Sequence, residues 1–407
     1  MVSQWTTVTF GEVVRLEQGL CFNKKTNHLM AETGIPLLRI ADLVNNTQTK
    51  FVDEERVPKK FIANPQDIIY SRTGQVGLVF KGKVGVVHNN CFRVIPKEGI
   101  ERDYVYWYLR QPSIIQKARS LAGGAAQPDL GHDAFKSISF TYPELEIQRR
   151  IVGILSAYDD LIENNTQRIK ILEEMAQALY REWFVKFRFP GHEKVRMVES
   201  ELGMVPEGWE VKKATDAIYV NPTTKVPKEG KKPFVSMGNL SNDSMFVNSF
   251  EYRSGNSGSK FKNGDTLFAR ITPCLENGKT AYVQFLQSNN DIAFGSTEFI
   301  VLRSKTLCSE LVYLMARSNE FRDNAIKSMS GATGRQRVQE ACFDKFLFAH
   351  PDSKIISPFV EHVSLHLQNA YILNKKNANL RRTRDLLLPK LISGEVDVEK
   401  IDVRMAQ

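Results

Sequence analysis

Two polar segments of the chain carry residue types that can hydrogen-bond nucleobases. Arg72 and Thr73 follow an apolar run in the first half of the chain, and Arg270 and Thr272 follow a similar run in the second half. An arginine can donate two parallel hydrogen bonds to a guanine edge, whereas lysine mainly contacts phosphate. The two arginines occupy equivalent places. This equivalence fits base recognition, and it equally fits a structural role in which each arginine fastens a loop to the core.

The same reasoning selects further side chains in loops rich in polar and basic residues. Asparagine and glutamine can bind adenine as arginine binds guanine. The candidates for DNA base contacts are Arg39, Arg72, Thr73 and Gln127 in the first half and Arg270, Thr272, Arg335 and Gln336 in the second half. The candidates for phosphate contacts are Lys24, Lys25 and Lys81 in the first half and Lys225 and Lys260 in the second half. Each of these can alternatively be an exposed loop residue without a ligand.

An internal repeat places these segments in two similar modules. The octapeptide Pro36–Leu43 returns as Pro233–Leu240, and the hexapeptide Asp67–Arg72 returns as Asp265–Arg270. The offset is about half the chain. A repeat of this kind predicts two copies of one fold, each free to bind its own variant of one kind of target.

Short apolar runs separated by Gly and Asn clusters predict strands in each module, followed by one helix. In the first module the expected elements are strands at Leu37–Ile40, Ile68–Ser71, Gly77–Phe80, Gly85–Val87 and Phe92–Ile95 and a helix at Tyr104–Leu121. In the second module they are strands at Phe234–Met237, Thr266–Ala269, Ala281–Phe285 and Phe299–Leu302 and a helix at Leu311–Ser328.

A sustained heptad pattern follows each module. Its apolar positions alternate in steps of four and three, which is typical of a coiled-coil seam. Each seam holds one asparagine near its middle, Asn165 and Asn377, a residue that fixes register at a cost in stability. The residues expected to pair the helices are Ile151, Leu155, Ile162, Asn165, Leu172, Leu179, Leu373, Asn377, Leu380 and Leu387.

The two helices can alternatively pack separately, each on its own module. The matched lengths and the asparagine in each favour mutual, antiparallel pairing. The expected fold class is therefore α+β: two repeated mixed α/β modules, each followed by a long helix, with the helices paired as an antiparallel coiled coil.

Composition and charge narrow the function classes. The 407 residues are 42% apolar and 25% charged, which describes a globular chain rather than a disordered one. No apolar run is long enough for a membrane span, and the first residues lack a secretory pattern, so we expect a cytoplasmic protein with five reduced cysteines. The net charge of +9 favours a polyanionic partner.

The motifs that usually carry catalysis or bind cofactors are missing. Asn277–Thr280 looks like the end of a phosphate-binding loop, but Pro273 stands where that motif needs its first glycine. His362 and His366 lie one helical turn apart without a third zinc ligand, so we expect no metal site. We expect no catalytic residue and no cofactor in this chain.

Three segments resemble the specificity subunit of type I restriction-modification enzymes. They are Pro143–Ile151 before the first helix, Leu179–Gly191 at its exit, and Leu386–Val396 near the C-terminus. One departure is the entry to the second helix, where Pro351–Ile356 lacks the Glu-x-Gln element of Glu146 and Gln148. The resemblance implies target-recognition domains at 1–145 and 209–353, conserved helices at 146–190 and 354–394, a linker at 191–208 and a tail at 395–407.

The resemblance also implies a function and partners. Each domain would read one half of a bipartite, asymmetric target in double-stranded DNA, while the helices set the spacing and dock two modification subunits. Those methyltransferase subunits would use S-adenosylmethionine, and a motor-nuclease restriction subunit would use ATP and Mg; the holoenzyme would then be an adenine-N6 DNA methyltransferase and ATP-dependent endonuclease. The alternative is a coiled-coil scaffold or a DNA-binding protein without a restriction-modification role.

Overall fold

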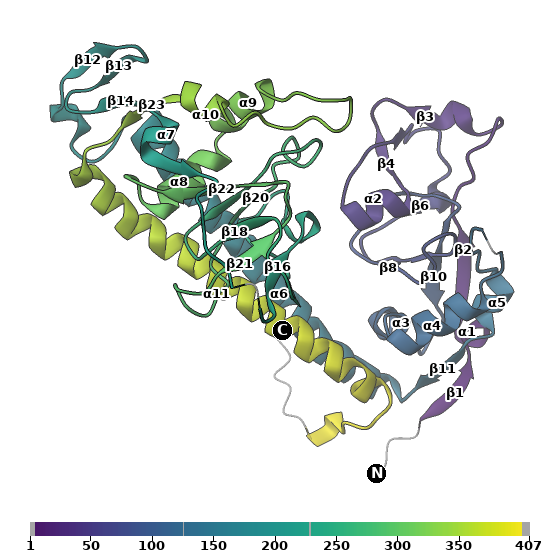
Figure 1. Cartoon of the computed structure of the whole chain (residues 1–407). Coiled ribbons are helices and arrows are strands. Elements are labelled where there is room, and N and C mark those ends of the chain that lie inside the picture. Colours follow the sequence, from purple (N-terminus) through teal and green to yellow (C-terminus); the bar gives the residue numbers. More distant parts are fainter. Residues whose placement is uncertain (1–4, 125, 228, 401–407) are drawn as a thin grey trace. The chain divides into compact units, whose positions relative to one another are not determined.

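The computed structural model describes residues 5–124, 126–227 and 229–400 of the chain. Its contacts divide the chain into two compact units. Unit 1 combines Met1–Ile162 with Asn379–Gln407, and unit 2 is Glu163–Ala378. Each unit therefore contains one module and one part of each long helix (Figure 1).

The first module, in unit 1, is built on two small sheets and a two-stranded ribbon. One sheet has the order β2-β10-β7-β8, the other β3-β5-β4-β9-β6, and β1 pairs with β11. The strands are β1 Thr6–Thr9, β2 Val14–Gln18, β3 Met30–Ala31, β4 Ile35–Leu38, β5 Phe51–Val52, β6 Ile62–Ala63, β7 Ile68–Ser71, β8 Val79–Phe80, β9 Gly85–Val87, β10 Cys91–Pro96 and β11 Ser139–Tyr142. The helices are α1 Phe10–Val13, α2 Ile40–Asn45, α3 Arg102–Leu109, α4 Pro112–Leu121 and α5 His132–Lys136.

The second module, in unit 2, repeats this topology. Its sheets have the orders β15-β22-β19-β20 and β17-β16-β21-β18, and β14 pairs with β23. The strands are β14 Glu210–Lys213, β15 Ile218–Val220, β16 Lys232–Val235, β17 Glu251–Arg253, β18 Ser259–Phe261, β19 Thr266–Ala269, β20 Thr280–Tyr282, β21 Ala293–Gly295, β22 Phe299–Ser304 and β23 Leu347–His350. The helices are α7 Ala214–Ala217, α8 Ser309–Arg317, α9 Asn319–Lys327 and α10 Cys342–Lys345, and a separate hairpin pairs β12 Met197–Ser200 with β13 Gly203–Pro206.

The repeat extends to strand direction. Among the described strands, the one parallel pair of each second sheet is made by equivalent strands, β4 with β9 and β16 with β21. One inner strand of each first sheet, β7 or β19, is buried along its length, as its mostly apolar sequence favours, and it ends at Ser71 or Ala269. The residue after it, Arg72 or Arg270, is thus held at the end of a rigid strand.

Two of the sequence predictions need correction. The single helices expected at Tyr104–Leu121 and Leu311–Ser328 are wrong, because each segment forms two shorter helices. Pro112 begins α4, where its missing N–H is tolerated, and the extended Ser318 caps α9 by accepting a hydrogen bond from the Phe321 amide. The strand predicted at Leu37–Ile40 lies two residues earlier, at Ile35–Leu38, because α2 begins at Ile40. The strands predicted at 68–71, 85–87 and 266–269 are confirmed.

The long helices are α6 Leu145–Tyr180, extended by a π-helical turn at Arg181–Val185, and α11 Ser353–Ile392. In unit 1, Ile151 and Leu155 near the start of α6 share a core cluster with Leu391 near the end of α11. In unit 2, Ala176 of α6 and Phe359 of α11 share another cluster. The helices therefore pair antiparallel, which confirms the predicted fold class. Among the described residues, no helix is long and apolar enough to span a membrane.

Candidate nucleic-acid interface

The first polar loop, described at residues 122–124 and 126–130, is fastened to the end of β7 by Arg72. The Arg72 guanidinium donates to the Leu130 carbonyl at 3.2 Å, to Gln18 Oε1 at 3.4 Å and to Asp129 Oδ2 at 2.5 Å. The backbone adds further bonds, because the Arg72 carbonyl accepts from the Leu130 amide and the Arg72 amide donates to the Asn90 carbonyl. All three nitrogen groups of the Arg72 side chain are thus engaged within the protein.

Thr73 belongs to the same cluster. Its hydroxyl bonds Asp129 Oδ1 at 2.8 Å, so one carboxylate holds both candidates. Gln18 Oε1 also contacts His132 Nε2 at 2.7 Å, and burial, with the charge of Arg72, lowers the pKa of His132. Gln127 lies in the exposed part of this loop, and the structure gives its side chain no partner among the described residues.

The second polar loop, residues 329–338, meets the end of β19 through the same backbone pattern. The Arg270 carbonyl accepts from the Val338 amide at 2.8 Å, and the Arg270 amide donates to the Glu298 carbonyl at 3.0 Å. Thr272 bonds this loop as well, because its hydroxyl accepts from the Gln336 amide at 3.0 Å. Arg335 is exposed at the tip of the loop.

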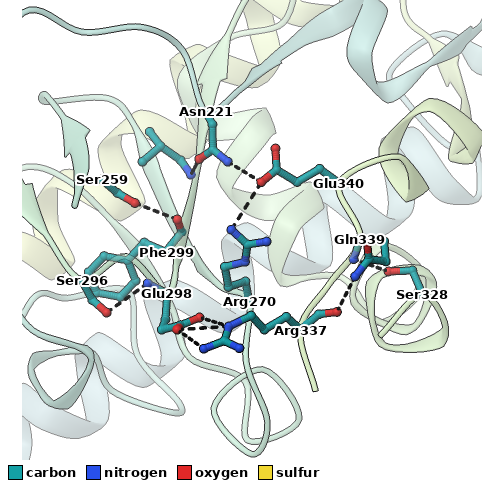
Figure 2. Close-up of polar contacts among 11 residues, drawn as sticks. Asn221, Ser259, Arg270, Ser296, Glu298, Phe299, Ser328, Arg337, Gln339 and Glu340 are labelled. Carbon is teal, nitrogen blue, oxygen red and sulfur yellow. Dashed lines mark hydrogen bonds and ion pairs between the residues drawn. The ribbon is translucent and has the colours of Figure 1, made fainter. Parts of the chain in front are cut away.

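The side chains around Arg270, which Figure 2 shows, form other contacts than those around Arg72. Arg337 forms a bidentate pair with Glu298, with contacts of 2.6 to 3.1 Å. Arg270 Nη1 lies 3.5 Å from Glu340 Oε1, which also accepts from Asn221 Nδ2 at 2.8 Å. The hydrogen bond from Arg337 lowers the pKa of Glu298, so this pair stays ionised at neutral pH.

Some of the other predicted contact residues form ion pairs within the protein, and others do not. Arg39 pairs with Asp42 at 2.7 Å, and Lys81 pairs with Asp103 at 2.5 Å. Lys24, Lys25 and Lys225 are exposed, Lys260 is half-buried in β18, and none of these four forms an ion pair within the described residues. The unengaged lysines are the ones free to meet phosphate.

The predicted helix-pairing residues all lie on α6 or α11, and each is buried or half-buried within its own unit. Ile151, Leu155, Ile162, Asn165, Leu373 and Asn377 are buried, and Leu172, Leu179, Leu380 and Leu387 are half-buried. Asn165 Nδ2 donates to Asn377 Oδ1 at 2.9 Å inside unit 2. The periodicity did not identify Leu367 and Leu388, which are buried next to the half-buried His366 and Leu387.

The sequence did not predict the carboxylates that pair with the arginines of the two strand ends, nor the arginine that holds the second loop. Asp129, Glu298, Arg337 and Glu340 appear in the sequence as ordinary charges in polar loops. Only their pairing in space shows their role. The repeat gave one signal that could have located these carboxylates. It aligns β7 with β19, and the carboxylates lie near the ends of these two strands.

The comparisons with known proteins agree with this architecture. Residues 2–174 match the family model described as "Type I restriction modification DNA specificity domain". The chain is 25% identical over 348 residues to the specificity subunit of type I restriction enzyme MjaIX of Methanocaldococcus jannaschii, covering 82% of this chain and 78% of that protein. The family match and these similarities support a specificity subunit of a type I restriction-modification system.

Two further similarities extend over nearly the whole chain. It is 21% identical over 477 residues to the specificity subunit of type I restriction enzyme HindI of Haemophilus influenzae, covering 97% of this chain and all of that one. A crystal structure of the S subunit of a type I restriction-modification system from M. genitalium covers 96% of both chains at 14% identity with a TM-score of 0.57. This second similarity supports the fold alone.

Proposed function

We propose that this chain selects the DNA sequence for a type I restriction-modification complex, with each module reading one half of a bipartite, asymmetric target. The observation that carries the proposal is the contrast between backbone and side chains at the two strand ends. The backbone bonds of Arg72 and Arg270 are the same, whereas the surrounding side chains differ. One scaffold with two sets of polar loop residues is what recognition of two different half-sites requires.

The helical pair would fix the number of unread base pairs between the half-sites. A 36-residue helix such as α6 is about 54 Å long, whereas one turn of B-DNA measures about 34–36 Å. Inserting one heptad in each helix should lengthen the tolerated gap and leave both half-sites unchanged. An unchanged gap would contradict this part of the proposal.

The helices would also dock the two modification subunits, whose methyltransferase sites use S-adenosylmethionine. A restriction subunit would supply ATP- and Mg-dependent cleavage, and the complex would work in the cytoplasm. Of the aromatic and basic residues at the exit of α6, Tyr180 and Trp183 are buried within unit 2, whereas Lys186 and Arg188 are exposed. The exposed pair is therefore the better candidate for contact with a partner.

The decisive experiment is single-molecule mapping of N6-methyladenine in a methylation-free host that expresses this chain with its cognate modification subunit. Methylation confined to one bipartite motif is the expected result, and it would report both half-sites and the gap. A complex that assembles and stays soluble without methylating any motif would contradict the proposal and favour the scaffold alternative.

A further inference from the structure

Backbone hydrogen bonds align the two strand ends residue by residue. Leu130 and Val338 are equivalent because their amides donate to the carbonyls of Arg72 and Arg270. The preceding residues, Asp129 and Arg337, are then equivalent too, and both form the same type of isolated β-bridge to the strand end and to the start of their loop. Asn90 and Glu298 are equivalent because their carbonyls accept from Arg72 and Arg270.

This alignment shows that the charge at the loop position is reversed between the modules. In the first module the loop residue is the acidic Asp129, and its partner is Arg72 at the strand end. In the second module the loop residue is the basic Arg337, and its partner is Glu298, at the position of the neutral Asn90. Each module thus has one ion pair that fastens its loop, but different residues form it.

The reversal leaves Arg270 with fewer partners than Arg72. Within the described residues, the Arg270 guanidinium makes one ion pair at 3.5 Å, with Glu340, and its buried Nε has no hydrogen-bond partner. The Arg270 side chain is 27% exposed, compared with 21% for Arg72. The buried Nε is out of reach from outside the chain, but Nη2 makes no hydrogen bond or ion pair within the described residues, so Arg270 can receive an external acceptor there.

We propose that the fastening of the recognition loop has passed from Arg72 in the first module to Arg337 in the second, which leaves Arg270 to contact DNA directly. Arg72 is then a positioning residue that acts through Asp129 and the first loop. Arg270 is a contact residue whose acceptor is a base edge or a phosphate oxygen. This inference rests on the proposed function.

The first test compares loop order in the full chain by hydrogen exchange. Arg72→Ala should speed exchange of the first loop, and Arg337→Ala that of the second, by about 10- to 100-fold. Arg270→Ala should leave the second loop as slow as before. Lys117→Ala and Lys327→Ala are matched controls, because they remove exposed charges without an ion pair in the described structure.

Rescue variants separate fastening from contact. The charge-swapped double variant, Glu298→Arg with Arg337→Glu, should restore slow hydrogen exchange in the second loop. Transplanting that pair into the first module, as Asn90→Glu with Asp129→Arg in the Arg72→Ala background, should restore both slow exchange and recognition of the first half-site. If hydrogen exchange in the first loop became slow again while recognition of the first half-site stayed relaxed, Arg72 itself would contact DNA. That result would overturn the assignment for the first module.

The second test maps N6-methyladenine with each variant in the assembled complex. Arg270→Ala should change recognition of the second half-site only. A base contact predicts about 10- to 100-fold weaker discrimination at one base pair. A phosphate contact predicts uniformly weaker binding with the salt slope reduced by about one. Unchanged recognition with an ordered loop would overturn the assignment for Arg270.

The failure of the proposed function would look different. If the wild-type complex methylates no bipartite motif, the function is wrong whatever the loops do. If the wild-type complex methylates its motif and Arg337→Ala leaves the second loop slow in exchange, the fastening role of Arg337 is wrong. The hydrogen-exchange result does not depend on DNA, so the two outcomes can be distinguished.

Discussion

The two units stabilise their parts of the helical pair by different polar contacts. In unit 1, Arg384 of α11 is buried in the seam, where it pairs with Asp159 of α6 and faces the Trp107 ring at 5.8 Å. Asp159 also pairs with Arg110 at 3.3 Å, so one carboxylate links both helices to the module. In unit 2 the seam instead contains the neutral Asn165–Asn377 pair.

The contact between helix and module in unit 2 is made by a separate residue. Glu173 of α6 accepts a hydrogen bond from the Met245 amide at 2.9 Å, and burial raises the pKa of Glu173 to about 7. Unit 1 thus combines helix pairing and module attachment in one charged cluster, whereas unit 2 divides them between a neutral pair and a buried acid. The difference shows that equivalent folds can place their buried polar groups at different points.

The largest expected effect comes from breaking the charged cluster. Asp159→Ala leaves Arg384 buried with only Asp385, which lies at 2.8 Å, as its partner. Because a buried charge that loses one of its two carboxylate partners is costly and Asp159 is itself partly exposed, we expect unit 1 to lose about 2–4 kcal/mol. Hydrogen exchange resolved by unit should show faster opening in unit 1, while unit 2 keeps its protection. Equal loss in both units would contradict the division.

The buried acid of unit 2 predicts a pH-dependent effect. Since the folded pKa of Glu173 lies near 7, above its ordinary value of 4.5, the folded state binds more protons and its stability falls as pH rises from about 4.5 to 7. Glu173→Gln keeps the acceptor for Met245 and removes the charge. We expect this variant to be about 1–3 kcal/mol more stable than the wild type at pH 8.

The control for this prediction is the same measurement at pH 4, where the wild-type carboxyl is neutral. There the two proteins should have nearly equal free energies of unfolding. A constant difference across the pH range would show that packing, and not ionisation, separates the wild type from Glu173→Gln.

A smaller effect is expected from the asparagine pair. Replacing both Asn165 and Asn377 by leucine removes a satisfied buried polar pair, so stability should change by no more than about 1 kcal/mol and can increase. The register of the helices should become less specific. Cysteine cross-linking between facing seam positions in unit 2 would detect this as additional cross-linked registers. A single register in the double variant would show that apolar packing alone fixes it.

The smallest effects are expected from the exposed lysines, and they should be equal in the two units. Lys25 and Lys225 are exposed and have no ion pair in the described structure, so each alanine variant should reduce the salt slope of DNA binding by about one without changing sequence preference. Lys81→Ala is the matched comparison, because Lys81 is held by Asp103. Titration of DNA binding against salt concentration measures all three variants. A change in sequence preference would assign the lysine to a base.

The sequence by itself determined the repeat, the central strands and the helical pair. Asp67–Arg72 and Asp265–Arg270 predicted β7 and β19 because a short, mostly apolar run between polar residues is typical of a buried strand, and such a run is a local pattern. The four-three spacing around Asn165 and Asn377 predicted the pairing because a coiled-coil seam repeats in the sequence itself. The family resemblance came from other segments, at the ends of the long helices: Pro143–Ile151, Leu179–Gly191 and Leu386–Val396.

Only the tertiary structure decided which arginine fastens a loop and which keeps free donors. Asp129 lies 57 residues after Arg72, and Arg337 lies 39 residues after Glu298, so no local pattern links the partners. The break at Ser318 shows the same limit on a smaller scale, because it depends on a capping bond from the Phe321 amide, whereas the break at Pro112 follows from the proline itself. Periodicity determines which face of an element is buried, whereas the partner of a charged side chain depends on segments that meet only after folding.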